Sequence, residues 1–154
     1  PVSGIGEMSR VESDPWPPYL ETRLEIGPPP HATVAHFSTA VLEGALKGCW
    51  HVITAFNPSG AEWTDGQNRA AHERLREALA ELQVTFQRSL GTTPDGRWPE
   101  DGFAVAGLTR AQAIDLGRRF GQHAIFEIDA ASGRLLDCDS SLEVADVPWR
   151  APNQ

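Results

Sequence analysis

The polar residues best spaced for chemistry lie within and just after an apolar run in the first half of the chain. They are Thr54, Asn57, Ser59 and Asn68. The run at residues 49–56 (CWHVITAF) is typical of a buried strand, and the turn at 57–60 (NPSG) ends it. A helix is predicted to start near Thr64, so the strand end and the helix N-terminus would present amides and hydroxyls to a polar ligand, with the helix favouring an anion. The alternative is structural: Asn57 forms a turn before the following proline, and Asn68 braces the first helical turn.

Two further segments carry side chains that could do chemistry. Glu100 and Asp101 follow Trp98 and Pro99, and a carboxylate pair beside a tryptophan could hold a general base with a raised pKa, or be part of a solvated turn. Gln122 and His123 lie between a predicted helix and the next strand. Gln122 could reach the same site, and His123 could act as a base or simply be exposed. We therefore expect Glu100 as the catalytic candidate and Thr54, Asn57, Asn68 and Gln122 as ligand-binding residues.

The chain lacks the usual spacings of metal and cofactor sites. Its five histidines include no pair spaced as in His-x-x-x-His, and its two cysteines do not form a Cys-x-x-Cys pair. It contains no Walker phosphate loop, no Gly-x-Gly-x-x-Gly fingerprint and no Gly-x-Ser-x-Gly elbow. We therefore expect no metal and no cofactor. Cys49 and Cys138 are expected to be free thiols in a reduced compartment, or one disulfide if their strands are neighbours.

Charge and hydropathy limit the classes of partner. The 154-residue chain carries 21 acidic and 13 basic residues, a net charge of −8. Because nucleic acids and anionic membrane surfaces are bound by concentrated positive charge, we expect neither as a partner. No basic segment followed by an apolar run opens the sequence, and no stretch of about 18 apolar residues occurs in it. The expected location is the cytoplasm.

The hydrophobic pattern predicts one α+β domain over residues 19–138, with a flexible tail at 1–18 and a polar tail at 139–154. The simplest architecture is a single mixed, mostly antiparallel sheet with two main helices packed on one face. Some strand pairs could be parallel, because a helix between two strands makes a crossover.

The two helices are the clearest elements of this pattern. One is expected at about residues 64–83 with Thr64 as its N-cap, and the other at 110–121 with Thr109 as its N-cap. Strands are expected within residues 19–26, 31–37, 49–56, 84–90, 102–108, 123–128 and 134–138. Residues 38–47 could be helical or an irregular insertion.

Several segments in combination resemble one protein family. They are residues 53–58 (ITAFNP), Asn68 and Leu75 on the predicted helix, 98–100 (WPE) with 103–105 (FAV), and 120–126 (FGQHAIF). These segments resemble the bacterial domain-of-unknown-function family 3293 over about residues 19–130, with departures in the Pro-rich front and at residues 28–47. The resemblance implies that Asn57, Asn68, Glu100 and Gln122 form one set. Three amides and one carboxylate suit hydrogen-bond recognition better than covalent catalysis.

Two functions from different classes fit these features. The first is a small-molecule site, binding or enzymatic, that recognises a polar group such as a nucleotide base or an amide. Glu100 would be its general base. The second is a protein–protein interaction module or accessory subunit that uses Pro-rich terminal arms and exposed tryptophans as anchors. These tryptophans are Trp16, Trp63, Trp98 and Trp149.

Overall fold

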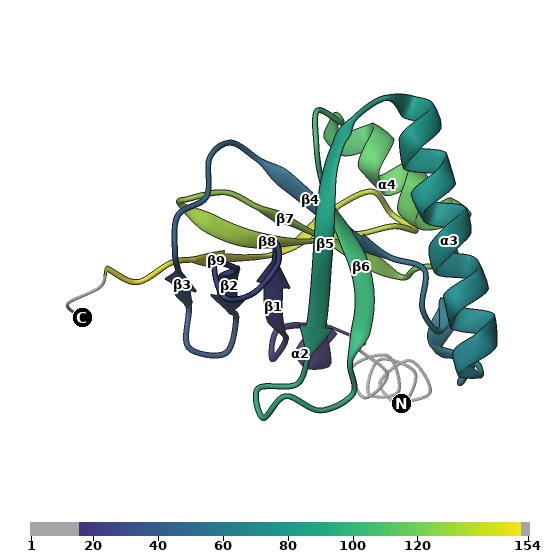
Figure 1. Ribbon diagram of the computed structural model, residues 1–154. Helices are drawn as coiled ribbons and strands as arrows, with labels where there is room; N and C mark the ends of the chain where they lie inside the picture. The colour runs from purple at the N-terminus through teal and green to yellow at the C-terminus, as the bar shows by residue number, and fades with distance from the viewer. Residues whose placement is uncertain (1–15, 152–154) are drawn as a thin grey trace, which may run out of the picture.

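The computed structural model describes residues 16–151, and within that range it contains nine strands and three α-helices (Figure 1). The helices are α2 (Trp16–Tyr19), α3 (Asp65–Leu82) and α4 (Arg110–Arg119), and a short 3-10 turn, η1, spans Pro58–Gly60. The strands are β1 (Arg23–Ile26), β2 (Thr33–His36), β3 (Val41–Glu43), β4 (Trp50–Thr54), β5 (Thr85–Thr92), β6 (Glu100–Ala106), β7 (Ala124–Ile128), β8 (Ser132–Asp137) and β9 (Glu143–Pro148). The fold is therefore α+β, as the sequence predicts.

All nine strands form one antiparallel sheet. Their order across the sheet is β3-β2-β1-β5-β6-β4-β7-β8-β9, and every neighbouring pair runs antiparallel. The expectation of a mixed sheet is therefore wrong, for a topological reason. Helix α3 connects two strands that point the same way, β4 and β5, but β6 lies between them. Likewise, α4 connects β6 to β7, and β4 lies between those two.

The two long helices and the four central strands form one unit. In chain order it reads β4, α3, β5, β6, α4, β7, which is the β-α-β-β-α-β arrangement of the ferredoxin-like type. Strands β1 to β3 extend its sheet on one side, and β8 and β9 extend it on the other. Within the unit, the end of β4 pairs with the start of β6, where Thr54 lies opposite Gly102. This pairing brings the turn after β4 close to the first residues of β6.

Alternate side chains of the sheet enter two separate cores. On one face, Ile53 and Phe103 pack in a cluster that includes Leu75 of α3 and Ile114 of α4. On the other face, Val52 packs in a second cluster with Leu24, Ile26, Ala35, Phe37, Ala104 and Ile128. Burying each large side chain stabilises the fold by about 1.5–3 kcal/mol, so both faces of the sheet contribute to stability.

Both long helices begin where the sequence predicts. The Thr64 hydroxyl accepts a hydrogen bond from the backbone N–H of Gln67, whose side chain accepts one from the backbone N–H of Thr64. Thr109 and Gln112 form the same capping box on α4, and such boxes satisfy N–H groups that a helix leaves free in its first turn.

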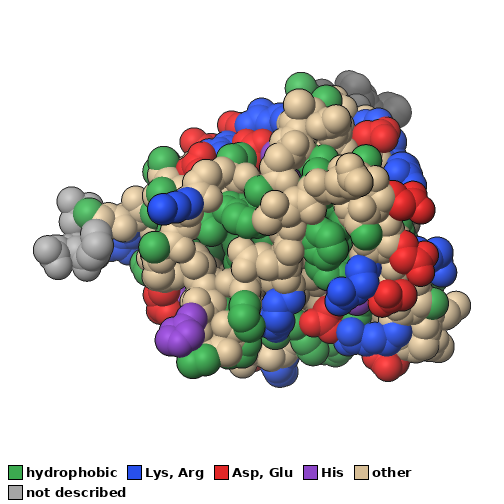
Figure 2. Space-filling model, turned by 45° about the horizontal axis from the view of Figure 1, so that its top comes forward, with side chains coloured by type: hydrophobic (Ala, Val, Ile, Leu, Met, Phe, Trp, Pro, Cys, Tyr) green, Lys and Arg blue, Asp and Glu red, His purple; other side chains and the backbone are tan. Residues whose placement is uncertain are grey.

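Charged side chains of both signs gather over the side of α3 (Figure 2). No helix in the described range is long and apolar enough to cross a membrane.

The two ends of the sheet meet at one point, so the sheet has the shape of a half-barrel. The backbone N–H of Arg150, just after β9, donates to the carbonyl oxygen of Ala40, just before β3, at 2.7 Å. The ring of Trp149 packs edge-on against Phe37 with 5.4 Å between ring centroids. Gly133 makes this contact possible, because a Cβ at that position would lie 2.6 Å from Trp149 and 2.7 Å from Phe37.

The ends of the chain and one inner segment differ from the expectation. The predicted polar tail contains β9, which pairs with β8 as an edge strand and buries no residue fully, so its apolar pattern is weak. The segment at 38–47 contains the short strand β3 and no helix. Residues 16–18 of the predicted N-terminal tail belong to α2. The rest of that tail, and residues 152–154 of the other, lie outside the described residues.

Candidate functional site

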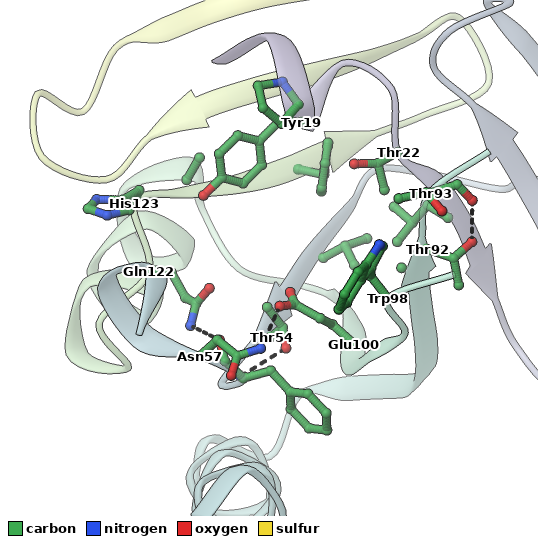
Figure 3. Close-up of a pocket in the computed structure, with 18 of the residues that line it drawn as sticks. Tyr19, Thr22, Thr54, Asn57, Thr92, Thr93, Trp98, Glu100, Gln122 and His123 are labelled. Carbon is green, nitrogen blue, oxygen red and sulfur yellow. Dashed lines mark hydrogen bonds between the residues drawn. The ribbon is translucent and has the colours of Figure 1, made fainter. Parts of the chain in front are cut away.

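A cavity of about 670 Å³ lies on the sheet face that carries Val52 and Thr54. Its wall comes from α2, the end of β4, the start of β6, the turn before β6 and the loop that joins α4 to β7. Figure 3 shows the labelled side chains of these segments around one space. The volume is within the usual range for small-molecule sites, about 300–1,000 Å³.

Asn57 links the end of β4 to the start of β6. Its backbone is in the left-handed region (φ 45°), which Asn tolerates better than most residues. Its side-chain Nδ2 donates to Glu100 Oε2 at 3.0 Å, and its Oδ1 accepts from the backbone N–H of Trp63 at 3.1 Å. Because the Trp63 donor must meet the amide oxygen, the amide nitrogen faces Glu100.

Asn68 holds Asn57 in place through two hydrogen bonds. It is buried, and its Oδ1 accepts from the backbone N–H of Asn57 at 2.8 Å. Its Nδ2 donates to Asn57 Oδ1 at 3.2 Å. It is not one of the residues that line the cavity. Asn68 therefore positions Asn57 and does not itself face the space where a ligand would lie.

Thr54 and Gln122 line the cavity with part of their hydrogen-bonding capacity already used. The Thr54 hydroxyl donates to the carbonyl oxygen of Asp101 at 2.7 Å and accepts from the backbone N–H of Phe56 at 3.1 Å. Gln122 Nε2 donates to the carbonyl oxygens of Phe56 and Phe120, each at 3.2 Å. The Gln122 Oε1 atom is therefore the one that points away from these carbonyls, toward the cavity (Figure 3).

Glu100 places a partly buried carboxylate in the wall. One of its oxygens accepts the hydrogen bond from Asn57. Within the described residues it has no ion-pair partner. Burial raises its pKa, and the hydrogen bond from Asn57 offsets part of that rise. Glu100 can therefore accept a hydrogen bond or a proton from a bound molecule.

Tyr19 is a wall residue that the sequence analysis missed. Its ring packs 6.3 Å from that of Phe126, and its hydroxyl points into the cavity (Figure 3). Burial raises the pKa of Tyr19, and so does the nearby charge of Glu100. The signal in the sequence was slight: Tyr19 is the one tyrosine of the chain, between a Pro-rich segment and the first strand.

Some of the other features predicted from the sequence line the cavity, and others lie elsewhere in the fold. Ser59, Trp98 and His123 line the cavity. Helix α3 contributes no residue to the described wall, and Thr64 caps the Gln67 N–H in its first turn. The expectation that this helix N-terminus favours an anion in the site therefore has no support in the geometry.

The tryptophans and cysteines differ in exposure. Trp98 is 76% exposed, whereas the other three tryptophans expected on the surface are partly buried. Trp149, in the predicted C-terminal arm, donates its ring N–H to the carbonyl oxygen of Asp129 at 3.0 Å. Cys49 is exposed and Cys138 is buried, and both are free thiols. The expectation of free thiols is confirmed.

A second polar cluster surrounds the buried side chain of Glu127. Its carboxylate accepts hydrogen bonds from Arg110 and Arg134, each at 2.6 Å, and from His51 at 2.8 Å. Cys49, His51 and Glu127 bring potential metal-ligand atoms within 4.8 Å of one another. However, both carboxylate oxygens are already engaged, and two guanidinium groups oppose a further cation. The Arg110 hydrogen bond, above all, lowers the pKa of Glu127 to about 2, as expected for an ion-pair network.

Comparison with known proteins gives a family. The model of the family described as Protein of unknown function (DUF3293) matches residues 53–125, a segment that begins in β4 and ends in β7 and so covers most of the β-α-β-β-α-β unit. Thr54, Asn57, Asn68, Glu100 and Gln122 lie inside the match. No curated protein and no solved structure matches the chain. The resemblance seen in the sequence is confirmed: residues 53–125 are similar to this family of proteins of unknown function.

Proposed function

We propose that the cavity binds a small polar organic molecule, such as one that carries a nucleotide base or an amide, and recognises it by hydrogen bonds. The observation that carries the proposal is the 3.0 Å contact between Asn57 and Glu100. It holds a partly buried carboxylate at the cavity wall with one oxygen free. Because burying a charged group is costly unless it is paired, a ligand that donates to this oxygen gains affinity.

An enzymatic role would rest on Glu100 as a general base. Its raised pKa moves the carboxylate closer to the pH at which such groups exchange protons effectively. The Tyr19 hydroxyl points into the same space and is a possible proton donor. Binding without catalysis requires fewer functional groups than an enzymatic reaction, and we propose it ahead of the enzymatic role.

We also infer that α3 and α4 both cover the sheet face opposite the cavity. The support is the alternation along β4. Ile53 packs with Leu75 of α3 and Ile114 of α4, whereas its neighbours Val52 and Thr54 line the cavity. On this arrangement a ligand can enter without movement of either helix.

The test is a thermal-shift screen of a metabolite panel that includes nucleosides and primary amides. A ligand at 100 times its Kd adds about 2.7 kcal/mol to stability, which is roughly 5–10 °C for a chain of this size. We expect at least one such shift for the wild type and its loss in Asn57→Ala and Glu100→Ala. Glu81→Ala, on the exposed side of α3, is the matched control. The proposal fails if no compound shifts the wild type, or if the shifts persist in both cavity variants.

A second candidate is a protein–protein interaction module. The observation that favours it is the exposed ring of Trp98, which is large and apolar enough to anchor a partner. Because residues 143–148 form part of the sheet, the useful variants are Trp98→Ala and deletion of residues 1–15. Pull-downs that recover the same partners equally with the wild type and with both variants would count against this function.

A further inference from the structure

At Asn57, Gln122 and Glu100, the polar atoms that remain free at the cavity wall are mostly hydrogen-bond acceptors. Asn57 uses its amide nitrogen on Glu100 and its amide oxygen on the Trp63 N–H. Gln122 directs its amide nitrogen at two carbonyl groups, which leaves its oxygen. Glu100 keeps one oxygen without a hydrogen bond from any described residue. A ligand that satisfies this wall must therefore bring N–H or O–H donors.

The wall is also negatively charged. Glu21, Glu62 and Glu100 lie around the cavity, and the described lining contains no lysine or arginine. The next residue along β6 provides a contrast: Asp101 pairs with Arg69 at 2.5 Å, whereas Glu100 has no cationic partner in the part of the chain that the structure describes. An anionic ligand would be repelled here, and a cationic one would supply the missing counter-charge.

Trp98 adds a flat aromatic surface beside these acceptors. Its backbone has a positive φ of 56°, a conformation that costs energy for a bulky residue. Its ring is 76% exposed, so packing within the protein does not explain the conformation. Figure 3 shows the ring next to Glu100 at the cavity. A cation over a tryptophan face is attracted by the ring, and a planar group can also stack on it.

These three observations lead to a ligand class. Building on the proposed function, we propose that the cavity takes a cationic head group rich in N–H donors: an amidinium, a guanidinium or a protonated amine. The Glu100 carboxylate is its counter-ion, the Gln122 carbonyl oxygen is a second acceptor, and Trp98 covers its face. This assignment replaces the anion that the position of the α3 N-terminus suggested.

Three ring compounds of similar shape and different charge provide the test: benzamidine (cation), benzamide (neutral) and benzoate (anion). Their Kd values are measured by isothermal titration calorimetry with the full chain at pH 7. A charge-assisted hydrogen bond is worth more than a neutral one by about 1 kcal/mol or more, so we expect benzamidine to bind at least about fivefold more tightly than benzamide. Benzoate should bind most weakly. Glu100→Gln should bring the first two within about twofold of each other, whereas the surface control Glu81→Gln should leave the benzamidine preference unchanged.

The possible outcomes separate the ligand class from the proposed function. If benzoate binds as tightly as benzamidine, or if Glu100→Gln leaves the benzamidine preference intact, the cationic ligand class is overturned. If the three compounds bind alike while a neutral metabolite gives shifts that depend on Asn57, the ligand class fails and the proposed function stands. If none of the three binds at millimolar concentration, the ligand class also fails, and the metabolite screen decides the proposed function independently.

Discussion

Replacement of Glu127 by Gln gives the sharpest test of the energetics of this fold. The buried carboxylate accepts from both Arg110 and Arg134 at 2.6 Å. His51 completes the set at 2.8 Å. The substitution keeps the shape of the side chain and removes its charge. It also leaves Arg134, whose side chain is 14% exposed, with Asp129 as its remaining ion-pair partner.

The magnitude follows from the pKa of Glu127, which these partners lower from 4.5 to about 2. At about 1.36 kcal/mol for each pKa unit, the difference corresponds to roughly 3 kcal/mol. Because the pKa is lower in the folded state, this stabilisation is complete above the unfolded-state value of about 4.5 and is lost as the pH falls toward 2. The network should therefore weaken selectively in acid.

The assay is urea denaturation of the wild type and of Glu127→Gln at pH 7, 5 and 3. We expect the variant to be less stable by about 3 kcal/mol at pH 7 and 5, and the gap to close progressively below pH 4. Glu81→Gln, which changes an exposed charge on α3, should behave like the wild type throughout. A gap that is the same at pH 7 and pH 3, or one below about 0.5 kcal/mol at pH 7, would refute the reasoning.

Two further substitutions test the packing and the hydrogen bonds near the cavity. Gly121→Ala should cost about 2 kcal/mol of stability or more, because Gly121 has a φ of +72° and an added Cβ would lie 2.6 Å from Pro58. Gly107→Ala is the control: Gly107 has a φ of +91° and open space around it, so its loss of stability measures the backbone strain without a clash. Equal losses for the two variants in urea denaturation would exclude the clash. Asn68→Ala should cost about 1–3 kcal/mol by leaving the Asn57 backbone N–H without its acceptor, and Asn68→Asp, which keeps an acceptor oxygen, should retain more stability in the same assay.

Local signals in the sequence predicted the parts of the fold that depend on near neighbours. Thr64 and Gln67 are three residues apart, so their capping box can be inferred without knowledge of the tertiary structure. Asn57 and Asn68 were grouped by the same local reasoning, because one short turn joins the strand end to the helix start, but the hydrogen bonds between them were not predicted. The placement of Glu100 in one set with Asn57, 43 residues earlier, was implied only by the family resemblance, and the hydrogen bond between them was not predicted.

Features that depend on distant partners could not be predicted in this way. Strand β9 has exposed acidic residues, and its contacts, the pairing with β8 and the ion pair of Glu143 with Arg110, are with residues that its own pattern does not identify. The strand order could not be predicted for the same reason. A helix between two strands favours a parallel direction for them, but it does not show that a third strand lies between them. Tyr19 joins the cavity because its ring packs on Phe126, a residue far along the chain.

The hydrogen bond between Arg150 and Ala40 also bears on when the protein can finish folding during synthesis. Strands β1 and β5 pair although α3 lies between them in the sequence. The hydrogen bond that joins the two ends of the sheet cannot form until residue 150 has been synthesised. Pairings between distant segments slow folding because the chain must lose entropy before they form. A nascent chain that has completed the β-α-β-β-α-β unit would still have an open sheet, with the aromatic cluster of Phe37 and Trp149 unformed. We therefore expect closure of the half-barrel to follow the emergence of β9 and Arg150 from the ribosome.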